Sequence, residues 1–85
     1  MSRIATEDLI TVNLYGGLET YSPTEQRKGN KLASNKVSHI KDILEYYNIP
    51  AEEVQVVLIN GKHADMNNKI PAGSTVSIFP LVGGG

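Results

Sequence analysis

The stretch VQVVLING, residues 54–61, decides the fold. Five of its first six residues are apolar and four of those are β-branched, which is typical of an interior strand covered on both faces. Asn60-Gly61 follows at once and is the strongest short turn signal in the chain, because both residues tolerate a positive φ. The stretch therefore predicts a strand over Val54–Ile59 that leads into a short hairpin.

Upstream of this strand, one helix is expected over Ser38–Tyr47. Ser38 suits the N-cap, because its hydroxyl can accept a hydrogen bond from an otherwise unpaired amide of the first turn. Asn48 suits the left-handed residue that follows a helix, and Pro50 prevents its continuation. The apolar residues in between recur at the spacing of one helix face, namely Ile40, Ile43, Leu44 and Tyr47.

The N-terminal part of the chain predicts two strands of unequal clarity. Leu9–Tyr15 alternates between apolar and polar residues and stops at Gly16-Gly17, which indicates a half-buried strand followed by a turn. The stretch 18–36 is polar and is the hardest part of the chain to interpret. We expect a poorer strand there or just beyond it, near Leu32–Val37.

A last strand is expected over Thr75–Pro80, after a turn at 71–74, with Val76 and Ile78 facing inward. One helix against a mixed sheet is an α+β sandwich of two layers. We therefore expect a single domain over residues 1–82, of which 1–8 form a frayed arm, and a flexible glycine tail over 83–85.

Size and composition exclude several kinds of protein. The 85 residues suffice for one small domain, which leaves little room for an internal catalytic cavity. Lysine and arginine total 8 against 9 aspartates and glutamates, so the chain lacks the cationic excess of a nucleic-acid-binding protein. It has no cysteine and no apolar run long enough to cross a bilayer. We expect a cytoplasmic protein that binds neither nucleic acid nor membrane.

Within the body of the chain, no group of residues has the pattern of a catalytic or metal site. His39 and His63 lack the partner set that a metal or a general base requires, even though Asp65 is close to His63 in sequence. Glu52-Glu53 is best interpreted as a solvated pair before a strand. Gly16-Gly17 lacks the following Gly-Lys-Ser/Thr of a phosphate loop. We expect no metal, no bound cofactor and no enzymatic activity in the body.

The C-terminal segment is different, because the last strand runs through Leu81 and Val82 into Gly83-Gly84-Gly85. Glycines lack side chains and adopt any backbone angle, so a narrow channel can accept them. From Leu81 to Gly85 the chain can project up to roughly 16 Å. This arrangement suits the presentation of the Gly85 carboxylate to another protein's active site, and an ordinary flexible end is the alternative.

Three stretches carry a resemblance to a known family: VNLY at 12–15, VLINGK at 57–62, and PAGSTVSIFP at 71–80 before the glycines. They resemble the ThiS/MoaD family of ubiquitin-like, β-grasp sulfur carriers, above all the small subunit of molybdopterin synthase. The resemblance covers Leu9 to Gly85, strongly from Val54 onward and weakly over 16–36. Gly84-Gly85 match the family's two terminal glycines. Leu81 stands where many members have a second proline, which weakens the assignment to a subfamily.

The resemblance implies a function in which partner enzymes supply the catalytic groups. An activating enzyme would use ATP to adenylate the Gly85 carboxylate, and sulfur would then convert it into a thiocarboxylate. That group would donate sulfur in the biosynthesis of molybdopterin, the molybdenum or tungsten cofactor. The sulfur-accepting partner would be the large subunit of molybdopterin synthase or a thiazole synthase. The residues implied are Gly85 as the reacting group, Gly83 and Gly84 for threading, and Phe79, Pro80 and Leu81 for partner binding.

Other functions fit the same sequence. The chain could carry sulfur toward the thiazole of thiamine or another sulfur pathway, or act as a ubiquitin-like modifier with Gly85 joined to a lysine. It could also be an interaction module with an inert tail. The alternation of the last strand turns Phe79 away from the main core, so its ring either docks a partner or covers a small cluster with Leu81 or Leu9.

Overall fold

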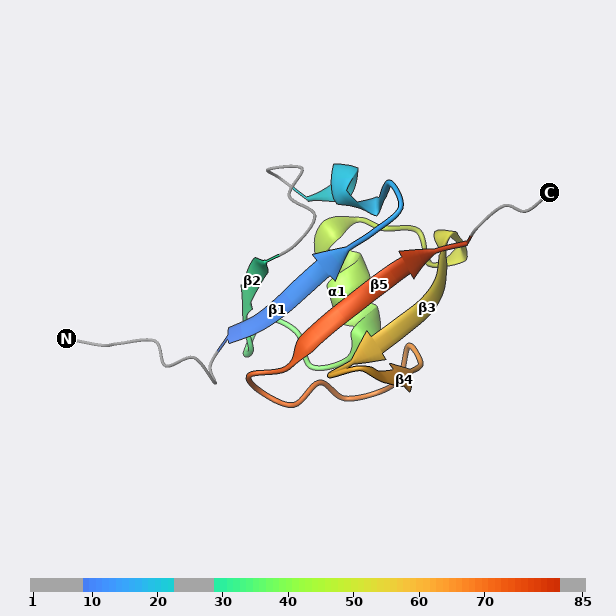
Figure 1. Cartoon of the computed structure of the whole chain (residues 1–85). Helices are drawn as coiled ribbons and strands as arrows, with labels where there is room; N and C mark the ends of the chain where they lie inside the picture. Colours follow the sequence, from blue (N-terminus) through green and yellow to red (C-terminus); the bar gives the residue numbers. More distant parts are fainter. Residues whose placement is uncertain (1–8, 23–28, 82–85) are drawn as a thin grey trace.

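The computed structural model describes residues 9–22 and 29–81 of the chain. The described residues form a five-stranded sheet in the order β2-β1-β5-β3-β4, with the helix α1 against one face (Figure 1). The elements are, in chain order, β1 (Leu9–Leu14), η2 (Leu18–Tyr21), β2 (Asn30–Ala33), α1 (Ile40–Tyr47), η3 (Ala51–Glu53), β3 (Val54–Ile59), β4 (Lys62–Ala64) and β5 (Thr75–Pro80). The expected frayed arm over 1–8 and the glycine tail over 83–85 lie outside the described residues.

The middle strand of the sheet is β5, the last strand in the sequence. It pairs in parallel with β1, where Thr11 lies opposite Thr75 and Leu14 lies opposite Ile78, and it pairs antiparallel with β3. The remaining strands β2 and β4 pair antiparallel with β1 and β3 and form the two edges. The predicted α+β class, a mixed sheet packed on one main helix, is confirmed.

The core lies between α1 and the face of the sheet toward it. Every second residue of β1 and β5 points into this layer, and so does the apolar face of α1, as the spacing predicts. The buried residues include Ile10, Val12, Leu14, Ile40, Ile43, Leu44, Tyr47, Val76 and Ile78. Burial of the Tyr47 ring raises its pKa to about 12, because the phenolate would be poorly solvated there.

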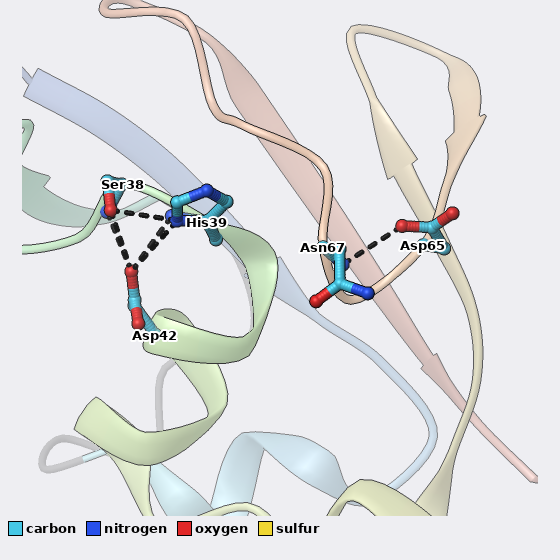
Figure 2. Close-up of polar contacts among 5 residues, drawn as sticks. All are labelled: Ser38, His39, Asp42, Asp65 and Asn67. Atoms are coloured by element: carbon cyan, nitrogen blue, oxygen red, sulfur yellow. Dashed lines mark hydrogen bonds and ion pairs between the residues drawn. The ribbon is translucent and has the colours of Figure 1, made fainter.

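The start of α1 differs from the prediction by one residue. His39 occupies the N-cap in place of Ser38, whose hydroxyl instead donates to Oδ2 of Asp42 at 3.0 Å (Figure 2). The same carboxylate oxygen accepts the backbone N–H groups of His39 and Ser38, at 2.9 and 3.0 Å. These hydrogen bonds, led by the one from His39, lower the pKa of Asp42 from 3.8 to about 2.

The loop before β5 explains why Ser38 is not required as an acceptor. The amides of Ile40 and Lys41, in the first turn of α1, donate to the carbonyls of Asn68 and Met66 at 3.1 and 3.0 Å. A distant segment therefore satisfies the amides that a local cap would otherwise bind.

The weak second strand was predicted two residues too late at its start and four residues too late at its end. The prediction placed it near Leu32–Val37, whereas β2 spans Asn30–Ala33. A turn begins at Ala33, whose carbonyl accepts the Lys36 amide at 2.9 Å, and Val37 is buried beyond that turn. The apolar signal of Val37 thus reflects burial in the core and not membership of the strand.

The turns agree with the sequence. Asn48 ends α1 with a φ of 61°, and Asn60-Gly61 joins β3 to β4 with φ values of 51° and 83°. Gly16 and Gly17 also adopt positive φ, at 63° and 98°. Asparagine and glycine tolerate this region better than other residues, which is why these signals were dependable.

The prediction for Val54–Ile59 is correct in its position and wrong in its burial. The strand β3 is interior, but only Val57 is buried, and Val56 and Leu58 are half-buried. The reason is that α1 covers one face of the sheet, and among the described residues no second layer covers the other (Figure 1). The apolar residues of β3 on that second face need a different explanation.

Candidate functional site

Phe79 lies on the face of the sheet that faces away from α1, as the alternation of β5 predicts. Its ring is half-buried and stacks on that of Tyr15, with the ring centroids 4.6 Å apart and the planes 6° from parallel. Offset stacking of this kind adds to the packing of two aromatic rings. The prediction that Phe79 turns away from the main core is confirmed, and its ring contacts Tyr15, a neighbour that the sequence analysis did not name.

Two apolar residues of β3 extend this pair. Val56 is paired with Phe79 in the sheet register, and Leu58 lies two residues further along the same face, opposite Ser77. Neither packs against the core cluster, in contrast to Val54 and Ile59 of the same strand. We call Tyr15, Val56, Leu58 and Phe79 the open-face patch. It is an apolar surface on the uncovered side of the sheet, near the C-terminal ends of β1 and β5.

Only Phe79 of this patch was named from the sequence. Tyr15 was interpreted as the end of a half-buried strand, and Val56 and Leu58 as residues covered on both sides. The signal that would have found them is the register, because β3, β5 and the residue that follows β1 each place an apolar side chain on the face opposite the predicted core. Strand order, which the sequence does not provide, is needed to use it.

Pro80 and Leu81, the other residues predicted to bind partners, follow Phe79 at the end of β5. Pro80 is half-buried and its ring lies against the backbone of Gly16. The Leu81 side chain is 57% exposed, while its amide donates to the carbonyl of Glu53 at 2.8 Å. The structure therefore places all three predicted residues together at one end of the sheet. The predicted reacting residue Gly85 and the threading residues Gly83 and Gly84 lie outside the described residues.

An acidic pair borders the same end of the sheet. Glu52 and Glu53 are both exposed in η3, in agreement with the solvated pair expected from the sequence. Glu53 also accepts a hydrogen bond from the Tyr21 hydroxyl, 2.9 Å from Oε1. This bond, together with burial and the charges of Glu53 and Glu52, raises the pKa of the Tyr21 phenol.

The histidines take no part in this site. His39 contacts Ser38 and Asp42 at the helix start, as a capping residue, and Asp65 accepts the amide of Asn67 in a separate loop (Figure 2). Among the described residues, no three acidic or histidine side chains gather closely enough to hold a metal ion. In the same part of the chain, no helix has the length and apolar character needed to span a membrane.

Comparison with known proteins identifies the family. The family described as Mut7-C ubiquitin matches residues 7–83, which is most of the chain. The chain therefore belongs to the Mut7-C ubiquitin family, and the ubiquitin-like assignment made from the sequence is confirmed. No curated protein sequence matches the chain.

Solved structures with the same fold come from an archaeon and a protozoan. SAMP1 from Haloferax volcanii has a TM-score of 0.67 at 18% identity, covering 91% of this chain and 99% of its own. A second structure, of H. volcanii small archaeal modifier protein 1, has a TM-score of 0.66 at 17% identity, covering 87% and 98%. Urm1 from Trypanosoma brucei has a TM-score of 0.63 at 20% identity, covering 92% and 96%. At these identities the likeness shows the fold, which is the predicted ubiquitin-like β-grasp.

Proposed function

We propose that this chain is a ubiquitin-like sulfur carrier and not itself an enzyme. The proposed reacting group is the Gly85 carboxylate, converted into a thiocarboxylate that donates sulfur in molybdopterin biosynthesis. The observation that carries the proposal is the position of β5: the middle strand of the sheet ends beside the open-face patch, and the sequence continues from it into three glycines.

The chemistry requires activation, because a carboxylate is a poor electrophile. A carboxylate oxygen of Gly85 attacks the α-phosphorus of ATP, pyrophosphate leaves, and an acyl-adenylate forms. The terminal sulfur of a partner's persulfide then attacks the acyl carbon and AMP leaves. A thiol of the partner cleaves the resulting acyl disulfide, which leaves the thiocarboxylate on the carrier and a disulfide on the partner. The partner supplies the nucleotide site and the thiols, since this chain has no cysteine.

The open-face patch supports the docking half of this function. An apolar, partly exposed cluster with two aromatic rings at its centre has the composition of an interface anchor. It adjoins the end of β5, so a partner seated on it would meet the C-terminal segment directly. The activating enzyme and the sulfur-accepting synthase, whether the large subunit of molybdopterin synthase or a thiazole synthase, would use this face in turn.

A protein modifier is the second candidate. The observation in its favour is the likeness to a structure named small archaeal modifier protein 1. Both functions begin with the same acyl-adenylate and differ in the nucleophile that follows, a sulfur atom or the amine of a lysine. The modifier function would therefore leave Gly85 in an amide bond to another protein.

Intact mass of the chain purified from its own cells tests the proposal. Because the chain has no cysteine, brief alkylation with iodoacetamide near neutral pH would mark a thiocarboxylate well before the less nucleophilic thioethers of its two methionines. We expect a fraction of the protein to gain the mass of one oxygen-to-sulfur exchange and to react with iodoacetamide. Protein that carries neither change, before and after incubation with ATP and the same cells' activating enzyme, would contradict the carrier function.

Two variants control the assay. Deletion of Gly85 leaves a carboxylate on Gly84, about 3.5 Å short of its place, and should abolish the mass gain. Lys62→Ala alters an exposed residue paired with Ile59, at the opposite end of β3 from Glu53, and should leave it unchanged. Cells without the gene should lose molybdopterin and regain it with the wild type alone. A requirement for thiamine would instead favour a thiazole pathway, and Gly85 found on lysines would favour a modifier.

A further inference from the structure

The C-terminal end of β5 is held by the body of the protein on both sides. On the side of β3, pairing continues past the register shift near Val54, because the Leu81 amide donates to the Glu53 carbonyl at 2.8 Å. On the side of β1, the Tyr15 amide donates to the Ile78 carbonyl at 3.2 Å. The backbone of Leu81 is thus fixed even though its side chain is 57% exposed.

Gly16 makes a contact with Pro80 that no other residue could make. Its φ is 63°, and a Cβ built on it would lie 2.5 Å from Cγ and 2.8 Å from Cδ of the Pro80 ring. Real Cβ atoms do not approach carbon so closely, so a side chain at this position would displace Pro80. Gly17 also has a positive φ, 98°, but a Cβ there would meet nothing within 4 Å. Both glycines therefore meet the need for a positive φ, and only Gly16 also has to leave space for a neighbouring ring.

Tyr21 supports the neighbouring contact between Glu53 and Leu81. Its ring packs against the core cluster, and its hydroxyl donates to Oε1 of Glu53 at 2.9 Å. Glu53 thus bonds Tyr21 through its side chain and Leu81 through its carbonyl. The hydrogen bond between Tyr21 of η2 and Glu53 of η3 therefore helps to fix Glu53, whose carbonyl accepts the Leu81 amide.

We infer that Gly16, Tyr21 and Glu53 are positioning residues, which fix the point and direction in which the chain leaves the body after Leu81. We call these three residues with Pro80 and Leu81 the exit clamp. The inference rests on the proposed function, in which a reacting group four residues beyond Leu81 must enter a partner's active site.

The exit clamp matters because only four residues follow Leu81, which limits how far from the body the Gly85 carboxylate can be placed. Four extended residues span at most about 14 Å. A segment held extended in a partner's active site has no slack, so a shift of its root displaces its end, and a misplacement of about 1 Å can cost on the order of a hundredfold in rate. Docking, in contrast, uses the open-face patch. Damage to the clamp should therefore lower kcat of the adenylation step and leave KM for the carrier nearly unchanged.

The first test compares Gly16→Ala with Gly17→Ala. Both variants place an alanine at a positive φ, which should cost about 1 kcal/mol of stability in each, and Gly16→Ala should lose more because its Cβ also clashes with the Pro80 ring. Only Gly16→Ala should displace Pro80. The assay measures adenylation by the activating enzyme of the same cells, through the release of pyrophosphate. We expect Gly16→Ala to lower kcat by about tenfold or more and Gly17→Ala to lower it by less than about twofold.

The second test is independent of activity. Tyr21→Phe removes one hydroxyl and keeps the ring, and Tyr46→Phe makes the same change at an exposed residue of α1. Amide hydrogen exchange should show faster exchange of Leu81 in Tyr21→Phe and in Gly16→Ala, with no change in Tyr46→Phe or Gly17→Ala. The kcat of Tyr21→Phe should fall between those of Gly16→Ala and the wild type.

These outcomes distinguish the two proposals. If the wild type is adenylated and Gly16→Ala reacts as fast as Gly17→Ala, the positioning inference is wrong and the carrier function stands. Unchanged exchange of the Leu81 amide in both clamp variants would overturn it as well. If the wild type is never adenylated, the proposed function fails, and the positioning inference fails with it.

Discussion

The two faces of the sheet are formed by the same strands and differ in almost every other respect. The face toward α1 carries Val12, Leu14, Val76 and Ile78, each with no exposed surface. The opposite face carries polar residues such as Asn13 and Ser77 together with the open-face patch, and these are half-buried. Alternation along a strand therefore separates two tasks in this small domain. One face maintains the fold, and the other is left to contact partners.

Ile43→Asp should have the largest effect, because it breaks the covered face. The Ile43 side chain is fully buried in α1, and a carboxylate there would be unpaired in the core. We expect a loss of about 3–5 kcal/mol, which lowers Tm by 12 °C or more at about 4–8 °C per kcal/mol. Thermal unfolding followed by circular dichroism measures it. Lys41→Asp, an exposed change in the same helix, is the control, and equal melting of the two variants would refute the packing of α1.

Phe79→Ala alters the uncovered face and should weaken partner binding more than it lowers stability. Removal of the ring takes away its stack on Tyr15, so we expect stability to fall by only about 1 kcal/mol. Affinity for the activating enzyme should fall by about 1–3 kcal/mol, the range for an aromatic anchor. Titration calorimetry against that enzyme measures it. Tyr15→Phe, which retains the stack, should bind nearly normally, and normal binding by Phe79→Ala would remove the patch from the docking surface.

Leu58→Lys tests whether docking extends along β3. Leu58 is half-buried on the uncovered face and lies outside the core cluster, so the charged end of a lysine can reach water. We expect binding to weaken by about 1–2 kcal/mol and stability to change by less than about 1 kcal/mol. Gln55→Lys adds the same charge at an exposed position of the same strand. Equal binding by these two variants would confine the docking surface to the aromatic pair.

Asp42→Asn should have the smallest effect and concerns neither face directly. The Asp42 carboxylate accepts hydrogen bonds at the start of α1, which lower its pKa from 3.8 to about 2. The charged form is favoured in the folded state, so its stabilisation is complete above about pH 4 and is lost as the pH falls through about 2. The wild type should therefore melt slightly above Asp42→Asn at pH 7, and the difference should shrink toward pH 2. A difference that is constant over this range would contradict the role of the charge.

The patterns that predicted correctly are those with a local physical cause. The spacing of Ile40, Ile43, Leu44 and Tyr47 identifies one face of a helix whatever packs against it. Asn48 and Asn60 adopt positive φ, a region that asparagine tolerates better than most other residues, so their positions predicted the turns. The alternation of β1 and β5 likewise identified their buried residues before the strand order was known.

The errors arose where a distant segment decides the outcome. Ser38 was expected to cap α1, but carbonyls from residues 66 and 68 already bind the amides of the first turn. Val37 was expected in a strand, but it is buried beyond a turn. Val56 and Leu58 were expected to be covered on both sides, since composition alone does not reveal how many layers a sheet has.

The sequence by itself determined the fold class, the helix, the turns, the inward residues of β1 and β5, and the outward placement of Phe79. It did so because side-chain periodicity and backbone preference act within a few residues. Only the tertiary structure decided that Phe79 stacks on Tyr15, that Gly16 admits the ring of Pro80, and that Glu53 holds Leu81. Each of these contacts joins residues more than twenty-five positions apart in the chain, and their approach is set by the pairing of β1 and β3 with β5.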